Sequence, residues 1–324
     1  MRIETVSGTI EPDRLGGVLM HEHIAALTLD GFYGGDAGDS DLAIRALERL
    51  PGMGIGTLVD LTGRTRVEAN GGLDGVAAMA RDVPLHIVVG FSFYKDPWLG
   101  NAGSSDIDEL TALYVEEASG SGGIKAGIYG EVGTSLDEIT PGEELHLRAV
   151  ARAHLTTGLA ISTHCTLGTM ALDQVEILLS EGADPTRVVV GHMDLRPEVS
   201  HLEDLLATGV NLGFDTWGKE WFDYRVPGSE GDSPGEFVKW AYHRPDDDRV
   251  AALTDLCARG YDDRIVMSCD MSGAEAWLNP TTHGNHGYAY LPTVVLPRLR
   301  RGGVADSSLQ RMLVDNPARI LAIP

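Results

Sequence analysis

Residues 17–24 read GVLMHEHI, an apolar run that ends in two histidines separated by one residue. A short apolar run indicates a buried β-strand, and side chains two positions apart on a strand share one face. We therefore expect His21 and His23 to point the same way. Two neutral imidazoles on one face can bind one transition metal ion. For this motif alone, a pair of buried histidines that only packs in the core is the simpler alternative.

Seven further apolar runs follow along the chain, separated by longer amphipathic segments. They cover residues 56–61, 86–91, 123–131, 160–164, 188–192, 210–215 and 265–270. Apolar residues at helical spacing predict helices at 41–50, 143–157, 171–181 and 203–208. Eight buried strands alternating with helices predict an α/β fold, a single (β/α)8 TIM barrel over residues 1–324, preceded by a short N-terminal β-hairpin. An open doubly wound sheet is the alternative.

The charge of the chain bears on its partners. The 324 residues carry a net charge of −23, with an isoelectric point near 4.7. Such a charge repels the phosphates of nucleic acids and anionic membranes, so we expect neither as a partner and expect a small-molecule substrate. We expect no secretory signal, because the first residues lead into a polar, strand-like segment, and we find no run long enough to span a membrane and no paired spacing among the three cysteines. We therefore expect a cytoplasmic protein.

Potential metal ligands stand at the carboxyl ends of the predicted strands. They are the imidazoles of His21, His23, His164 and His192 and the carboxylates of Glu131 and Asp270. Active sites of such barrels form where these strand ends converge. Four imidazoles and two carboxylates suffice for two divalent ions with one carboxylate bridging them, and Asp270 could also accept a proton during catalysis. These donors suit zinc, manganese, iron and cobalt.

The motifs at these strand ends, taken in order, resemble those of the phosphotriesterase family of the amidohydrolase superfamily. They are HEH at 21–23, GIYGEVGTS at 127–135, ISTH at 161–164, VGH at 190–192, FDTWGK at 214–219, SCD at 268–270 and LVDNP at 313–317. The resemblance covers essentially the full length. It implies a (β/α)8 barrel with a binuclear metal centre, usually zinc, that hydrolyses its substrate with a metal-bound hydroxide. It also implies a homodimer.

The resemblance assigns the ligands to two ions. It implies that His21, His23 and Asp270 hold the more buried ion, that His164 and His192 hold the more exposed one, and that Glu131 bridges them.

One position departs from the family pattern. Phosphotriesterases proper and the related lactonases carry a carbamylated lysine as the bridge, and Glu131 stands there in this chain. Lys125 is no substitute, because six residues of strand at about 3.3 Å each separate the two positions. The glutamate and residues 287–290 look more like the phosphotriesterase-homology branch. In that branch the lactonases' arginine is absent, and Thr216 stands at its position here, which speaks against organophosphate hydrolysis and simple lactonase activity.

Four further side chains are candidates for contact with the substrate. They are Tyr94 after the third strand, Trp217 and Lys219 after the seventh, and His286 after the eighth. A substrate could lie against Tyr94, and Lys219, one of only four lysines, could receive an anionic group. Packing or surface roles are the alternatives. Asp60 and Asp215 could orient the histidines from behind.

Together these residues predict a metal-dependent hydrolase in which a bridging hydroxide attacks a carboxylic ester or a lactone. An amidase acting on an N-acyl amine is the nearest alternative, and weak phosphotriesterase turnover is a further one. A barrel that binds a ligand without catalysis is the alternative from another class, although all six ligand positions are filled. The glutamate at position 131 disfavours a single-metal deaminase of the same superfamily.

Overall fold

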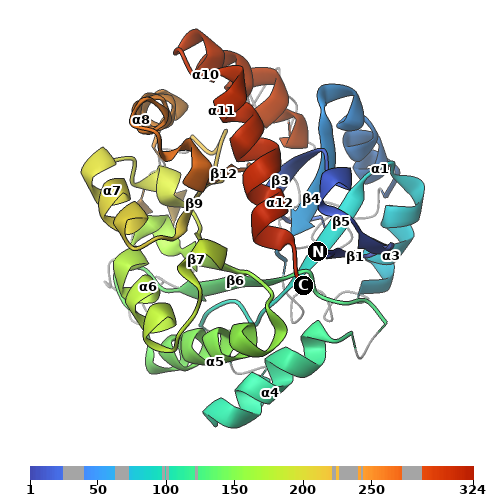
Figure 1. Ribbon diagram of the computed structural model, residues 1–324, viewed down its shortest axis with the longest axis vertical. Coiled ribbons are helices and arrows are strands. Elements are labelled where there is room, and N and C mark those ends of the chain that lie inside the picture. The colour runs from blue at the N-terminus through green and yellow to red at the C-terminus, as the bar shows by residue number, and fades with distance from the viewer. Residues whose placement is uncertain are drawn as a thin grey trace.

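Eight parallel strands form one sheet that curls into a barrel with helices outside it (Figure 1). The computed structural model describes residues 1–24, 40–62, 73–96, 99, 102–120, 123–220, 224–225, 240–241, 244–271 and 287–324. The barrel strands, in sheet order, are β3 (Gly17–Glu22), β4 (Ile55–Asp60), β5 (His86–Phe91), β6 (Ile128–Thr134), β7 (Ile161–Cys165), β8 (Val188–Val190), β9 (Asn211–Phe214) and β12 (Ile265–Met267). Each overlaps a predicted run, and the predicted TIM barrel is confirmed.

Main-chain hydrogen bonds join the first barrel strand to the segment after the last. The backbone N–H of Asp270 donates to the carbonyl of His21 at 3.0 Å, and that of His23 donates to the carbonyl of Met271 at 3.1 Å. The two edges of the sheet thereby meet. This closure brings the first predicted ligands, near the N-terminus, beside the last one.

Helices cover the outside of the barrel. They are α1 (Ser40–Glu48), α3 (Leu73–Asp82), α4 (Ile107–Ala118), α5 (Pro141–Thr157), α6 (Ala171–Ser180), α7 (Val199–Ala207), α8 (Asp246–Ala258), α10 (Leu296–Arg301), α11 (Asp306–Gln310) and α12 (Asn316–Leu321). The four helices expected from apolar spacing correspond to α1, α5, α6 and α7, and α7 starts at Val199 instead of residue 203. Within the described ranges, no helix combines the length and apolar character that crossing a bilayer requires.

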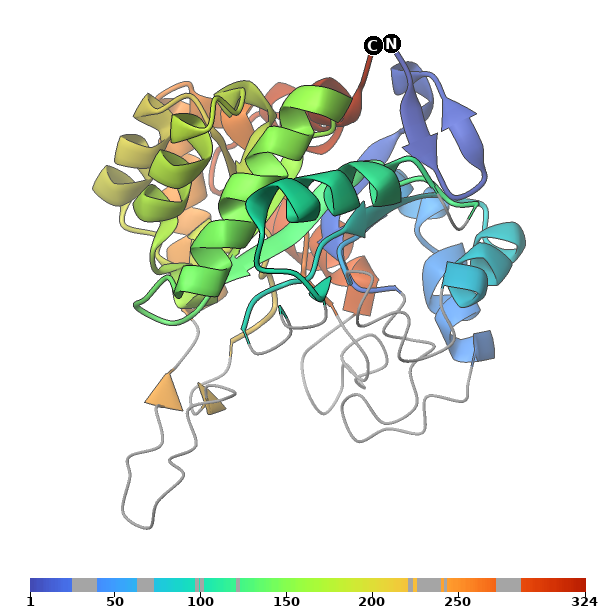
Figure 2. The ribbon, with the colours of Figure 1, turned by 90° about the horizontal axis from the view of Figure 1, so that it is seen from below.

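The predicted N-terminal hairpin is present. Strands β1 (Ile3–Thr5) and β2 (Gly8–Ile10) pair antiparallel. A second short pair, β10 (Tyr224–Arg225) with β11 (Trp240–Ala241), follows β9. The two chain termini lie side by side, where Arg2 and Ile323 exchange backbone hydrogen bonds of 2.9 and 2.8 Å (Figure 2).

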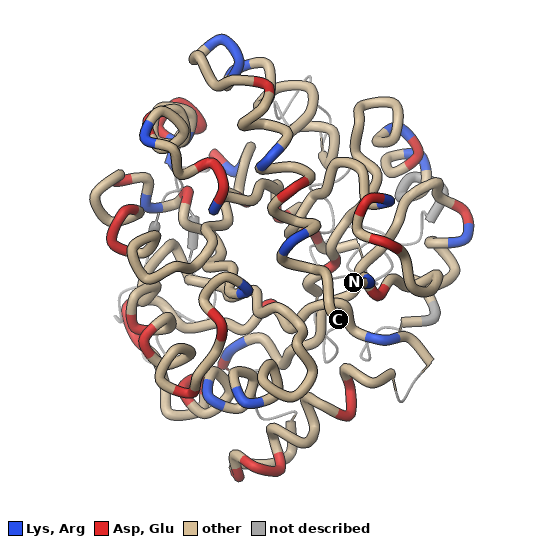
Figure 3. The backbone as a smooth tube through the Cα atoms, in the orientation of Figure 1, with Lys and Arg blue, Asp and Glu red and all other residues tan. Residues whose placement is uncertain are grey.

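Side chains of successive strand residues enter two different hydrophobic clusters. In β3, Val18 and Met20 belong to one cluster, and Leu19 between them belongs to the other. This alternation is what a strand buried on both faces requires, since one face packs inside the barrel and the other against the helices. Acidic positions, by contrast, lie all round the outer ring of helices in Figure 3, which fits the net charge of −23.

Candidate metal centre

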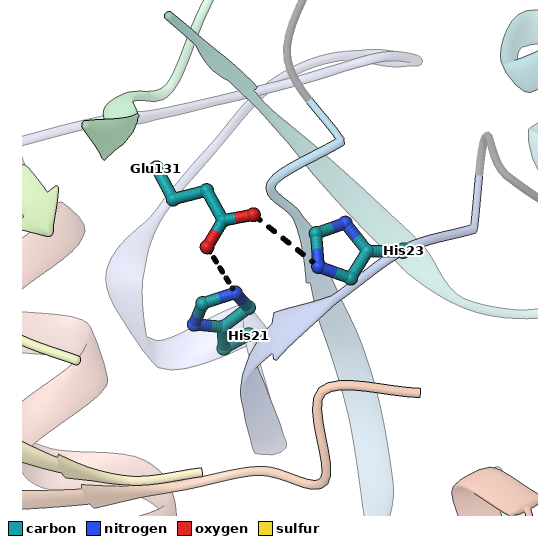
Figure 4. Close-up of side chains that lie close together, drawn as sticks. All are labelled: His21, His23 and Glu131. Atoms are coloured by element: carbon teal, nitrogen blue, oxygen red, sulfur yellow. Dashed lines mark ion pairs between the residues drawn. The ribbon is translucent and has the colours of Figure 1, made fainter. Parts of the chain in front are cut away.

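The structure brings all six predicted ligands together at the carboxyl ends of the strands. The carboxylate of Glu131 lies at their centre and faces His21 of β3 and His23 just after it (Figure 4). Its Oε2 is 3.3 Å from Nε2 of His21, and its Oε1 is 3.6 Å from Nε2 of His23. On the other side, Oε2 is 2.9 Å from Nδ1 of His164 and 3.7 Å from Nε2 of His192. One carboxylate is therefore shared by four imidazoles.

Asp270 completes the cluster on the side of β3. Its Oδ1 is 2.8 Å from Nε2 of His23 and 3.7 Å from Nε2 of His21. Across the cluster, Nδ1 of His164 is 2.8 Å from Nε2 of His192. Within the described part of the chain, ligand atoms of His21, His23 and Glu131, and those of Glu131, His164 and His192, lie within 4.8 Å of one another.

Irregularities in two strands turn ligands into the barrel. Ile128 packs inside and Tyr129 outside, so strict alternation would turn Glu131 outward. The pairing of β6 with β7 shifts register between Tyr129 and Val132, and Val132 again packs outside. A similar shift between Leu19 and Glu22 in β3 spans His21. Such bulges re-aim side chains and are frequent beside active sites.

Two aspartates lie behind the imidazoles, as expected from the sequence. Asp215 contacts Nδ1 of His21 through Oδ2 at 3.1 Å and Nδ1 of His192 through Oδ1 at 2.9 Å. Asp60 contacts His23 only through Thr62. It accepts a hydrogen bond from the backbone N–H of Thr62, whose hydroxyl is 3.4 Å from Nδ1 of His23. A carboxylate bonded to Nδ1 leaves Nε2 directed at the centre, the usual arrangement for a metal-binding histidine.

Three of the site residues adopt left-handed backbone conformations. The φ angles of Tyr94, His192 and Asp270 are +66°, +62° and +51°. Non-glycine residues in this region cost about 1–2 kcal/mol each and cluster at functional sites. The surrounding structure therefore fixes these side chains in orientations that an unconstrained chain would not favour.

The middle residue of the HEH motif has a role that the sequence did not reveal. Glu22 is fully buried, and its carboxyl accepts from the hydroxyl of Ser268 at 2.8 Å and from the backbone N–H groups of Cys269 and Met271 at 2.9 and 2.8 Å. Burial raises its pKa to about 8, although these hydrogen bonds lower it. Glu22 thus holds the backbone on both sides of Asp270. Only the contact between β3 and the segment that follows β12 makes this role visible.

The electrostatics of the cluster fit divalent cations. Burial opposes ionisation of Glu131, yet His164 and His21 hold its pKa well below the usual range. Burial likewise opposes protonation of His192, but Asp215 raises its pKa to about 9. Positive charge is therefore favoured between the carboxylates. Nε2 of His21 is buried and has no hydrogen-bond partner among the residues that the structure describes, as expected of a nitrogen reserved for a metal ion.

His164 differs from the other imidazoles. Burial lowers its pKa to about 3, although the neighbouring carboxylate of Glu131 favours the protonated ring. It presents Nδ1 to Glu131, while its Nε2 lies 3.2 Å from the hydroxyl of Tyr94. Tyr94, the predicted aromatic neighbour of the candidate ligands, is therefore in contact with one of them.

The other predicted substrate residues have different placements. Nζ of Lys219 lies 2.6 Å from Oδ2 of Asp270. Trp217 is fully buried and packs against Phe214, with ring centres 6.2 Å apart, which is the packing role given as its alternative; its contact with a substrate stays a prediction. An indole gains more from core packing than from exposure at the rim. His286 lies outside the described residues. Lys125 lies away from the site, 3.9 Å from Glu4 of the hairpin.

A buried charge cluster supports the turn that carries Lys219. Arg249 of α8 is completely buried, and its guanidinium donates to Asp246 at 2.6 Å and to the carbonyl of Lys219 at 3.0 Å. Its Nε lies 3.5 Å from Asp194, which in turn accepts from the backbone and hydroxyl of Thr216. Sequence reasoning missed this cluster, since nothing in the spacing of these residues connects them.

Comparison with known proteins agrees with this geometry. A phosphotriesterase homology protein of Mycobacterium tuberculosis is 35% identical, with 98% of this chain and 97% of that protein covered. An N-acetyltaurine hydrolase of Dictyostelium discoideum is 28% identical, with 99% and 98% covered. The crystal structure of a mutant PTE-like lactonase of Deinococcus radiodurans superposes with a TM-score of 0.79 at 27% identity, with 99% of this chain and 100% of that chain covered.

The sequence model of the phosphotriesterase family matches residues 1–321, nearly the whole chain. These relatives are named as hydrolases or homologues of hydrolases, and the His, Glu and Asp cluster described above could bind metal. The chain therefore belongs to the phosphotriesterase family, whose relatives indicate a hydrolase.

Proposed function

We propose that the chain is a metal-dependent hydrolase that cleaves a carboxylic ester or a lactone. The observation that carries the proposal is the convergence of four imidazoles on the buried carboxylate of Glu131. His21, His23 and Asp270 would hold one divalent ion and His164 and His192 a second, with Glu131 between them. We propose zinc, because nitrogen and carboxylate donors suit it, with Mn²⁺, Co²⁺ or Fe²⁺ as alternatives.

Divalent ions at such a site supply Lewis acidity, which polarises a carbonyl group and lowers the pKa of water. The chain's own residues supply orientation and proton transfer. Although burial raises the pKa of Asp270, the ammonium of Lys219 holds it well below the usual range. An ionised Asp270 can accept the proton of the attacking water and pass it to the leaving group. The ring of Tyr94, bonded to His164, would form one wall for the substrate.

An amide is the second candidate substrate, and the similarity to N-acetyltaurine hydrolases favours it. Ester and amide cleavage differ in what they demand of Asp270. A leaving amine must be protonated as the bond breaks, whereas a 4-nitrophenolate leaves without a proton. Asp270→Asn should therefore slow an N-acyl amine more than a 4-nitrophenyl ester. An equal loss on both would indicate that Asp270 acts only through metal binding.

The test is metal analysis joined to a substrate screen. The purified protein should contain about two metal ions per chain, as two-metal sites do, and lose its activity on chelation. Zinc, manganese and cobalt are then restored separately, and each form is assayed against 4-nitrophenyl esters, lactones, N-acyl amines and a phosphotriester. Hydrolysis of a carboxylic substrate by a reloaded form is the expected result. A protein that binds metal and cleaves no carboxylic substrate would contradict the proposal.

A histidine variant and its control sharpen this test. His164→Ala removes a ligand without touching the core and should lower turnover by at least about a hundredfold. His86→Ala is the matched control, because His86 begins β5 at the amino end of the strand. Circular dichroism should show both variants folded. A rate for His164→Ala that matches the wild type in metal-saturated buffer would overturn the assignment of this ligand.

A further inference from the structure

The candidate ligands are not equally buried. The side chains of His21, Glu131, His192 and His23 are 2, 3, 4 and 6% exposed, whereas those of His164 and Asp270 are 14 and 15% exposed. The cluster therefore opens to solvent at two residues, one in β7 and one just after β12. Among the candidate ligands, these two side chains are the most accessible to solvent.

A lysine lies beside each of these two residues. Nζ of Lys219 is 2.6 Å from Oδ2 of Asp270. On the other side, Nζ of Lys95 donates to the hydroxyl of Thr166 at 2.5 Å, and this hydroxyl is 3.1 Å from Nε2 of His164. The positive charge of Lys95 is close enough to contribute to the low pKa of His164, after burial and the neighbouring His192. An ammonium group thus lies on each side of the cluster, that of Lys219 buried in its ion pair with Asp270 and that of Lys95 partly exposed.

This placement is notable in so acidic a protein. The chain carries a net charge of −23 and has only four lysines, at positions 95, 125, 219 and 239. At long range such a charge repels an anion, so an anionic substrate needs local positive charge where it binds. Two of the four lysines are positioned to provide that charge. Lys125, beside the N-terminal hairpin, is not.

We propose that Lys95 and Lys219, on opposite sides of the cluster, provide the local positive charge for a substrate that carries an anionic group, a carboxylate or a sulfonate. The inference rests on the proposed function and names the substrate class of the same site: anionic esters, lactones or amides. An ammonium forms charge-assisted hydrogen bonds with either kind of anion. Lys219 would have a second role, since its contact with Oδ2 leaves Oδ1 of Asp270 directed at His23.

Binding can be tested without catalysis. Propane-1-sulfonate and its neutral isostere methyl propyl sulfone contain no hydrolysable bond, and butyrate and 2-pentanone form the equivalent carboxylate pair. Each is titrated calorimetrically into the zinc-loaded full-length protein. The wild type should bind at least one anion about tenfold or more tightly than its neutral isostere, as one charge-assisted hydrogen bond predicts. Equal affinity within both pairs would overturn the proposal.

Lysine variants separate binding by the ammonium groups from binding by the metal alone. Lys95→Met and Lys219→Met should each weaken anion binding about tenfold and leave the neutral isosteres unaffected. Lys219→Arg should restore most of the loss, and Lys125→Met is the matched control that should behave as the wild type. Zinc content is measured for every variant, because Lys219 contacts a candidate ligand. Anion binding unchanged in Lys95→Met would overturn the proposal even if Lys219→Met loses zinc.

A hydrolysis assay distinguishes failure of this inference from failure of the proposed function. N-acetyl-β-alanine is compared with its neutral primary amide, and 4-nitrophenyl hydrogen glutarate with 4-nitrophenyl butyrate. Lys95→Met should raise KM for the anionic member of each pair and leave KM for the neutral one unchanged, whereas Lys219→Met also alters Asp270 and is judged by binding alone. Equal KM values for the anionic and neutral substrates, unchanged in the lysine variants, would refute the inference and leave the hydrolase proposal intact. Lysine-dependent anion binding without turnover of any substrate would refute the hydrolase proposal and support the anion-binding role of the lysines.

Discussion

Asp215 contacts His192 twice: its Oδ1 accepts from the backbone N–H at 2.8 Å and from the ring Nδ1 at 2.9 Å. The first bond helps to hold His192 in its left-handed conformation, and the second fixes the ring so that Nε2 faces Glu131. Oδ2 of Asp215 contacts the ring Nδ1 of His21. One carboxylate therefore orients a candidate ligand of each proposed ion.

Replacing this carboxylate should weaken metal binding without removing a ligand. Asp215→Asn keeps the shape but offers an amide that can donate to Nδ1 and so favour the wrong tautomer. We expect zinc affinity to fall about ten- to a hundredfold, as measured by competition with a chromogenic chelator. Asp255→Asn, on the exposed face of α8, is the control. Unchanged affinity in Asp215→Asn would show that the histidines are oriented by packing alone.

A glycine next to this carboxylate allows a more selective test. A Cβ at position 213 would lie 2.5 Å from Oδ2 of Asp215, the oxygen that contacts His21. Gly213→Ala should therefore displace that oxygen and lower the affinity for zinc, and overpacking should destabilise the fold by about 1–3 kcal/mol. Gly52→Ala places its Cβ in open space and serves as the control. If Gly213→Ala has the same zinc affinity and melting temperature as Gly52→Ala, the position of Asp215 does not affect metal binding or stability.

The strands and the ligand set could be predicted from the sequence for one physical reason. Parallel strands buried on both faces are continuous apolar runs, and their carboxyl ends meet, so polar residues that follow them converge. The direction of each side chain could not be predicted in the same way. Glu131 points inward only because β6 shifts register next to it, and no periodicity in the sequence marks that shift.

Contacts between distant segments were also hidden from the sequence. Glu22 supports the backbone around Asp270, and Lys95 reaches Thr166, because of how the barrel closes and how its strands neighbour one another. The packing of Trp217 was hidden from the sequence for a related reason. An aromatic residue in a loop after a strand can face the opening or the core, and only the packing against Phe214 decides between them.

The buried cluster around Arg249 should be essential for stability. Arg249→Met would leave the carboxylate of Asp194 buried without its cation, and that of Asp246 with only Arg298 at 3.7 Å, and should lower the free energy of unfolding by about 3–5 kcal/mol. Arg259→Met, at the end of the same helix, removes only exposed ion pairs with Asp255 and Glu203 and should cost less than about 1 kcal/mol. Urea denaturation of the zinc-loaded proteins measures both. Equal stability of the two variants would contradict the prediction.

His146, which is not one of the candidate metal ligands, should make the stability of the fold depend on pH. It lies in α5, where its Nδ1 is 3.1 Å from the hydroxyl of Tyr114, and burial lowers its pKa from 6.5 to about 4. The unfolded chain therefore binds a proton below pH 6.5 that the folded protein does not take up until about pH 4. Its contribution to stability is fully present above pH 6.5 and is lost as the pH falls through this window, up to about 3 kcal/mol.

A variant isolates this contribution. His146→Gln keeps a polar partner for Tyr114 but does not titrate, so its stability should fall less than that of the wild type between pH 7 and pH 5. Every other titrating group, the metal ligands included, is common to both proteins and cancels in the difference. Urea denaturation at each pH gives the two slopes. Parallel loss of stability in wild type and variant would mean that the imidazole of His146 is already protonated in the fold or exposed to water.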